Sequence, residues 1–213
     1  MLILTFFRLF ICAFFVVLSV SHSSAQPETN SGGRLDAKYA FVPDSTELVF
    51  ADVLNAMRTN PKSFLPAIDR YERYVISFTP DKKKLKVALK EIRARLKKQA
   101  PLLPLTVSGV LQGAADDHVA DLSRSGLMGH FGSDDSNPGT RVRKYGTFLT
   151  IGECITIGYL TPDLMVASML VDEGTPDRGH RESLLSSRFT HIGIGIADHP
   201  SLRIAAVVVL GAN

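Results

Sequence analysis

Cysteine is scarce in this chain of 213 residues, which contains only Cys12 and Cys154. Cys12 lies in an apolar N-terminal segment that we expect to be removed, so the mature chain retains one cysteine and cannot form a disulfide framework. Small exported domains often depend on disulfides because their cores are small. Residues 26–213 are long enough to bury a substantial core, so we expect packing to hold this fold together.

The chain also lacks a charge excess and a second long apolar run. Its 24 Lys and Arg face 21 Asp and Glu, and removal of residues 1–25 takes away only Arg8, which leaves 23 against 21. This balance argues against a nucleic-acid partner. No stretch after the N-terminal segment is apolar enough to cross a bilayer, so we expect no stable membrane span in the mature protein.

The common hydrolase signatures are missing as well. There is no GxSxG stretch that would place a serine nucleophile on a strand-to-helix turn, and no HExxH stretch that would place two zinc ligands on one helix face. No internal repeat is present either. These absences remove the commonest serine and zinc hydrolase families and the repeat architectures.

The N-terminus has the pattern of a secretory signal peptide. A single cation, Arg8, precedes the apolar core Leu9–Leu18, and the small residues Ser23-Ser24-Ala25 follow it. Small residues at this position favour cleavage after Ala25. We therefore expect residues 1–25 to be removed and the protein to be secreted or periplasmic. The alternative is an uncleaved membrane anchor formed by residues 1–20.

The mature chain reads as one domain preceded by a leader. Residues 26–44 are rich in Ser, Gly, Pro and Asn and predict a flexible leader, and residues 45–213 predict the domain. Helical spacing comes first and strand patterns come late, which predicts an α+β fold with an antiparallel sheet covered by helices. The predicted helices cover residues 46–60 with Ser45 as N-cap, 62–78 with an interruption or kink at Pro66, 79–98, 109–125, 161–171 and 180–187. The predicted strands are 191–196, half-buried, and 202–210, central.

The third predicted helix is unusually basic. Leu85, Leu89, Ile92 and Leu96 form its apolar line, and nine lysines and arginines flank them. Such a helix can be a patch for an anionic membrane or a polyanion, or simply a solvated face. The balanced charge of the whole chain favours the solvated face.

Two histidines and a set of carboxylates mark a candidate site. Gly129-His130 and Gly179-His180 bracket Gly152-Glu153, and Asp172-Glu173 precedes the second histidine. Imidazoles and carboxylates beside glycines, which we expect on loops, are the materials of a metal site or a general acid–base site. A further histidine, His118, lies on or beside the apolar face of its helix. We expect it to be a hydrogen-bonded core residue rather than a ligand.

The ordered series of motifs resembles the CAP superfamily, also called SCP-domain proteins, in its cysteine-poor bacterial form. The resemblance runs from Glu47 to Leu210 through LNAMRTNPKSF, LQGAADDHVADLSRSGLMGHFGSDDS, RVRKYG, GECITIGY and DEGTPDRGHR. It implies a three-layer α-β-α sandwich with a central antiparallel sheet and an open cleft. It also implies a cleft lined by two histidines and two acidic residues: His130, His180, Glu153 and either Asp172 or Glu173, of which we favour Asp172.

Three residues depart from the family pattern. Cys154 stands where asparagine usually follows the glutamate, Asp135 replaces a common glycine, and Met169 replaces a tryptophan. None of them removes a member of the four-residue set. The apolar neighbours of Cys154 predict a buried, unreactive thiol, although a single cysteine in an exported chain also invites a redox or dimerising role.

Two classes of function remain. The resemblance favours a secreted, non-enzymatic binding module whose cleft holds zinc or another divalent metal weakly, through His130 and His180, or holds an extracellular or envelope ligand such as a lipid, peptide or protein. A metal-assisted, peptidase-like hydrolase is the alternative. A third reading is purely structural, in which each carboxylate orients one imidazole and the cluster stabilises the cleft. Ser133 and Ser136 read as turn residues rather than nucleophiles.

Overall fold

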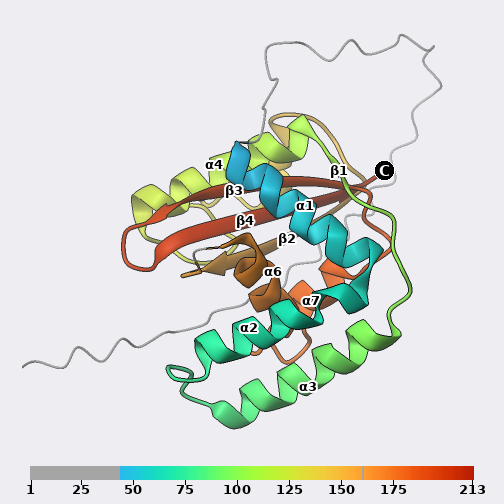
Figure 1. Ribbon diagram of the computed structural model, residues 1–213. Helices are drawn as coiled ribbons and strands as arrows, with labels where there is room; N and C mark the ends of the chain where they lie inside the picture. The colour runs from blue at the N-terminus through green and yellow to red at the C-terminus, as the bar shows by residue number, and fades with distance from the viewer. Residues whose placement is uncertain (1–43, 160) are drawn as a thin grey trace, which may run out of the picture.

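The computed structural model describes residues 44–159 and 161–213. The expected signal peptide, residues 1–25, and the leader up to residue 43 lie outside the described residues. A four-stranded sheet lies between two layers of helices (Figure 1). The strands are β1 (Thr106–Val107), β2 (Thr150–Ile157), β3 (His191–His199) and β4 (Arg203–Ala212), and the helices are α1 (Ser45–Thr59), the 3-10 helix η2 (Pro61–Phe64), α2 (Leu65–Val75), α3 (Lys82–Lys98), α4 (Gly109–Ser125), α5 (Pro138–Arg143), α6 (Pro162–Val171) and α7 (Gly179–Leu184).

The strand order in the sheet is β1-β3-β4-β2. The three long strands pair antiparallel, β3 with β4 and β2 with β4, as expected. The two-residue strand β1 pairs with β3 in parallel, which makes the sheet mixed rather than purely antiparallel. Strand β2 was not among the predicted strands, and it forms one edge of the sheet.

Each face of the sheet packs against its own helical layer. Cys154, Ile194 and Val208 belong to the core under α1, α2, α3, α6 and α7. Residues of the opposite parity, such as Ile155 and Val207, pack under α4 and α5. Side chains alternate between the two faces of a strand, so one sheet supplies both cores. The predicted α+β three-layer sandwich is confirmed.

Helix α4 lies unusually close to β3. A Cβ atom on Gly193 would fall on the backbone of Leu111 and Gln112, and one on Gly195 would lie 2.7 Å from the Ala115 carbonyl oxygen. The alternation of isoleucine and glycine in 191–196 predicted a strand with one exposed face. The strand is present, but the half-buried prediction is wrong, because the glycine face is where the backbone of α4 is seated.

Helix α1 begins at Ser45, the residue that we expected to be its N-cap, and the N-cap is instead Asp44. The carboxylate of Asp44 accepts hydrogen bonds from the backbone N–H groups of Thr46 and Glu47, and the Glu47 side chain accepts one from the Asp44 N–H. This reciprocal capping box satisfies donors that the first helical turn leaves open.

Within the part of the chain that the structure describes, no helix combines the length and apolar character needed to cross a membrane.

Candidate functional site

His130 and Glu153 form the first half of the site. The Nδ1 atom of His130 lies 2.8 Å from Oε1 of Glu153, and both residues are buried. We expected Glu153 on a loop, but it lies on strand β2. Its side chain faces the α4 and α5 layer, because it shares the parity of Ile151 and Ile155. A strand therefore fixes the carboxylate, and a loop after α4 brings the imidazole to it.

Arg141 holds the other oxygen of this carboxylate. Its Nη2 atom donates to Oε2 of Glu153 at 2.8 Å and to the backbone carbonyl of His130 at 3.0 Å. Arg141 is buried on the short helix α5, whose start is capped by Asn137. Arg141 was not among the site residues expected from the sequence. Its only signal was its place within the RVRKYG segment of the family resemblance.

His118 lies beside the same carboxylate from helix α4. Its Nε2 atom is 2.9 Å from the Gly129 carbonyl oxygen and 3.8 Å from Oε1 of Glu153. A carbonyl only accepts, so Nε2 carries the proton. Burial lowers the pKa of His118 and outweighs the nearby carboxylate, which favours a neutral ring. The geometry is that of the hydrogen-bonded core histidine we expected, placed next to the site.

The environment keeps Glu153 ionised. Burial by itself raises the pKa of this carboxyl, but the hydrogen bond from His130 and the charge of Arg141 act in the opposite direction. Together with the smaller contributions of His118 and His130, they hold the pKa below its usual range. A buried carboxylate thus accepts from one imidazole and one guanidinium.

Asp172 and His180 form the second half. Oδ1 of Asp172 lies 3.1 Å from Nδ1 of His180, and Oδ2 accepts the backbone N–H of His180 at 2.9 Å. Asp172 is the C-cap of α6 in a left-handed conformation with φ 50°, and His180 is in the first turn of α7. Although burial raises the Asp172 pKa, the hydrogen bond and charge of His180 and bonds from Thr175 and Arg181 lower it overall.

Glu173, the alternative to Asp172, has a different setting. Its Oε2 atom is buried without a hydrogen-bond partner among the described residues. Burial and the nearby charge of Asp81 raise its pKa and outweigh Arg178. The geometry therefore selects Asp172 as the carboxylate that orients His180.

Two arginines hold the turn that carries this second pair. Arg181 donates to the carbonyl oxygens of Leu170 and Val171, at 2.6 and 2.8 Å, and to Glu91 of α3 at 3.0 Å. Arg178 donates to the Asp172 carbonyl oxygen at 2.7 Å. The carbonyls at the end of α6 are thereby satisfied, which a buried helix terminus requires.

The four predicted residues thus stand as two histidine–carboxylate pairs. The pair of His130 and Glu153 faces the α4 layer, whereas the pair of Asp172 and His180 belongs to the α6–α7 layer, and both α6 and α7 pack against the edge strand β2. Among residues 44–159 and 161–213, no group of three or more His, Cys, Asp and Glu residues could hold a metal ion. A meeting of the two histidines at one ion remains a prediction.

Three other residues singled out from the sequence, Ser133, Asp135 and Ser136, shape the turn that follows His130. Ser133 donates to the Asp121 carboxylate at 2.5 Å, and the Ser136 backbone carbonyl accepts from Arg141. Both serines thus fix the turn. Asp135, where the family has glycine, takes φ 61°, the left-handed conformation that glycine adopts most easily.

Comparison with known proteins adds a family and several relatives. A sequence model described as the cysteine-rich secretory protein family, CAP, matches residues 51–210. The uncharacterized protein YkwD of Bacillus subtilis (strain 168) is 27% identical over 149 residues, which are 69% of this chain and 51% of that protein. The chain therefore spans about half the length of this curated relative.

Two solved structures are also similar. An outer surface protein from Borrelia burgdorferi is 22% identical with a TM-score of 0.45, over 62% of this chain and 94% of that chain. An extracellular protein containing an SCP domain from Bacillus anthracis str. Ames is 20% identical with a TM-score of 0.46, over 64% of this chain and 44% of that chain.

Proposed function

Because this chain belongs to the cysteine-rich secretory protein family, CAP, we propose that it is an extracytoplasmic binding module whose two histidine–carboxylate pairs hold a divalent metal ion or a small ligand without turning it over. The single observation that carries this proposal is the orientation of the imidazoles. Each of the two predicted histidines has its Nδ1 atom against a buried carboxylate, at 2.8 and 3.1 Å.

This orientation suits metal binding. When Nδ1–H donates to a carboxylate, the neutral ring has its lone pair on Nε2, and the carboxylate makes that nitrogen more basic. His130 and His180 would then hold the ion, while Glu153 and Asp172 would orient the two rings. Zinc accepts imidazole nitrogens in this way. Two protein nitrogens are fewer than most zinc sites use, so the binding would be weak and completed by water.

The extracytoplasmic location rests on the N-terminal sequence. Arg8, the apolar core Leu9–Leu18 and the exit Ser23-Ser24-Ala25 support export with removal of residues 1–25. In an exported protein the ligand would come from the envelope or the surroundings, as a lipid, a peptide or another protein.

A metal-assisted hydrolase is the second candidate, because the same orientation of the imidazoles would also serve catalysis. An imidazole oriented by a buried carboxylate is also how proteins position a general base. The two serines nearest His130 in sequence are engaged elsewhere, since the hydroxyl of Ser133 donates to Asp121 and that of Ser136 accepts from Arg141 at 3.3 Å. A hydrolase here would have to activate water.

One experiment distinguishes the two candidates. The exported protein, wild type and His130→Ala/His180→Ala, is assayed against panels of peptide, ester and cell-wall substrates with and without added zinc. In parallel, native mass spectrometry identifies metals and small molecules retained on purification. The binding module predicts retained ligand or metal that the double variant loses, with no turnover. Turnover that the double variant abolishes would instead select the hydrolase.

A further inference from the structure

Helix α3 concentrates positive charge that the totals for the whole chain conceal. Its 17 residues hold nine of the 24 lysines and arginines and one acid, Glu91. The rest of the chain therefore holds 15 cations and 20 acids, a net charge of −5, against +8 on the helix. Balanced totals were the reason to regard these cations as an ordinary solvated face, and the actual distribution is strongly segregated.

The cations follow the outer side of α3. Its inner side is buried against α2 and α6, whereas Lys83, Lys90 and Lys97 are exposed and repeat every seven residues. Seven residues are two helical turns, so these three lie on one side of the helix, about 10 Å apart along its axis. Lys86 lies close to the same line. These four residues, Lys83, Lys86, Lys90 and Lys97, form a lysine stripe.

The charges of the stripe are not neutralised within the protein. Arg93 pairs with Asp69 at 2.7 Å and Glu72 at 2.6 Å, both on α2. By contrast, no Asp or Glu of residues 44–159 or 161–213 comes within ion-pair distance, 4.0 Å, of a stripe lysine. Arg93 thus ties α3 to α2, and the four lysines of the stripe remain available to an external partner.

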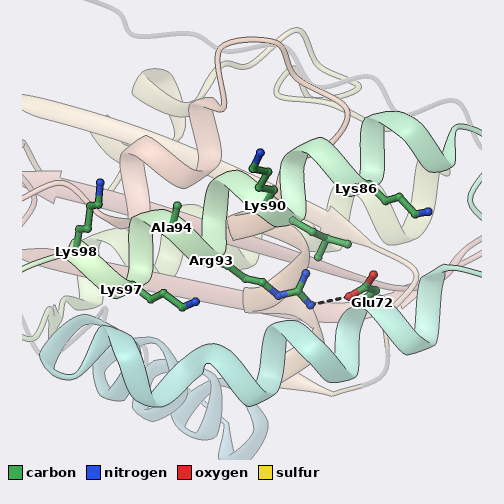
Figure 2. A pocket seen from close by; sticks show the side chains of 8 residues that line it. Glu72, Lys86, Lys90, Arg93, Ala94, Lys97 and Lys98 are labelled. Carbon is green, nitrogen blue, oxygen red and sulfur yellow. Dashed lines mark hydrogen bonds and ion pairs between the residues drawn. The ribbon is translucent and has the colours of Figure 1, made fainter.

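The shape of the surface around α3 favours a flat anionic surface over a small anion or a linear polyanion. A shallow groove of about 480 Å³ runs between α3 and α2, and Lys86, Lys90 and Lys97 line it (Figure 2). The lysine side chains point in different directions and do not converge on one point, so a small anion would have no cage. Glu72 lines the α2 side, so a linear polyanion seated in the groove would meet a carboxylate. A flat anionic surface would contact the outer side of α3, with its lysine stripe, and would not enter the groove.

Two apolar side chains are also exposed on α3 and in the turn before it. Val87, within α3, is 54% exposed, and Phe78, in the turn before the helix, is 43% exposed. Lysines together with a few apolar side chains suit the boundary between lipid headgroups and acyl chains. We propose that the outer side of α3 docks peripherally on a bilayer that contains anionic phospholipid. Without residues 1–25, which carry Arg8, the chain outside α3 holds 14 cations and 20 acids, and this net charge of −6 favours an orientation with α3 toward the anionic surface.

Vesicle binding tests this proposal. The protein is purified after export, its N-terminus is determined by mass spectrometry, and it is sedimented with vesicles of roughly 70% phosphatidylcholine and 30% phosphatidylglycerol or of phosphatidylcholine alone. Lys83→Gln/Lys90→Gln/Lys97→Gln is compared with Arg124→Gln/Arg143→Gln/Arg188→Gln, which removes the same charge from exposed positions outside α3. All six positions are exposed, so both variants should melt close to wild type.

The expected result is binding to the mixed vesicles and not to phosphatidylcholine. Each lysine near an anionic bilayer contributes about fivefold in affinity, so the stripe variant should lose on the order of a hundredfold, whereas the control should stay within about threefold because it retains the stripe. Equal loss in both variants would show a dependence on net charge alone and would overturn the proposal. Absence of wild-type vesicle binding would also overturn it, and tight binding of soluble polyphosphate in that case would identify a linear polyanion as the partner.

Discussion

Arg141 and Glu153 are joined at 2.8 Å between Nη2 and Oε2, and 2% and 1% of their side-chain surfaces are exposed. The guanidinium thus balances the one carboxylate that lies between His118 and His130. Removing one partner of such a buried pair leaves an uncompensated charge, whereas changing both partners does not. This pair fixes the position of the candidate site from inside the α4 and α5 layer.

The first prediction concerns this pair. Arg141→Met should lower the free energy of unfolding by about 3–5 kcal/mol, because the Glu153 carboxylate would remain buried without its cation. Arg141→Met/Glu153→Gln should recover part of that loss, because the uncompensated charge is gone. Urea denaturation at neutral pH measures both. If Arg141→Met costs no more than a change at an exposed arginine such as Arg143→Gln, the pair does not hold the site.

The second prediction concerns acid. The pKa values of Glu153 and Asp172 are lower in the folded protein than their ordinary values, so the unfolded chain takes up protons first as the pH falls. Their contribution to stability is therefore complete above the ordinary carboxyl range, at about pH 4 to 5, and is lost as the pH falls through the folded values. Melting temperatures should decrease below about pH 5.

A control identifies the groups responsible. In Arg141→Met/Glu153→Gln the Glu153 carboxylate is absent, so the decrease between about pH 5 and about pH 3 should be smaller than in wild type. An identical decrease in the two proteins would mean that other carboxylates govern the acid transition.

The third prediction concerns the close approach of α4 to β3. Gly193→Ala should destabilise the protein by about 2 kcal/mol or more, because its Cβ would fall on the backbone of Leu111 and Gln112, which cannot rotate away. Gly139→Ala is the control, since its nearest neighbours are side chains at 3.3 Å. Equal denaturation midpoints for the two variants would contradict this packing.

The fourth prediction concerns Cys154. Its side chain is 0% exposed and lies in the core beneath α6. A thiolate must be accessible to attack the disulfide of a thiol reagent, so labelling by a bulky aromatic disulfide should be slow in the native protein and complete in guanidinium chloride. Rapid stoichiometric labelling of the native protein, or a dimer on a non-reducing gel, would restore the redox or dimerising role.

The sequence predicted the helices better than the strands, for physical reasons. Helix α3 could be recognised because Leu85, Leu89, Ile92 and Leu96 repeat at helical spacing and end up buried. Strand β2 was missed because Gly152 and Glu153 interrupt its apolar pattern, and because Glu153 is buried by partners distant in sequence. Strand β3 was found, but its covered glycine face was not, since only the position of α4 determines what covers it.

The sequence named candidate site residues but did not predict how they are arranged. His130, Glu153, Asp172 and His180 came from motifs, and the structure pairs each histidine with one carboxylate. Arg141 could not be anticipated, because an arginine in a basic segment resembles a surface residue until its long-range partner is known. The choice of Asp172 over Glu173 likewise depends on the left-handed turn at the end of α6, which turns the Asp172 side chain toward His180.

Zinc titration by calorimetry tests the central claim, that His130 and His180 together hold a divalent metal ion. Wild type, His130→Ala/His180→Ala and the control His191→Gln are titrated at about pH 7.5 and about pH 5.5, on either side of the ordinary histidine pKa. Imidazole binds metal only when it is neutral, so wild type and the control should bind zinc at the higher pH and more weakly at the lower, and the double variant should bind at neither. Zinc should also raise the melting temperature of wild type but not that of the double variant. Equal zinc uptake by wild type and the double variant at the higher pH would contradict the account and leave the two pairs a structural role.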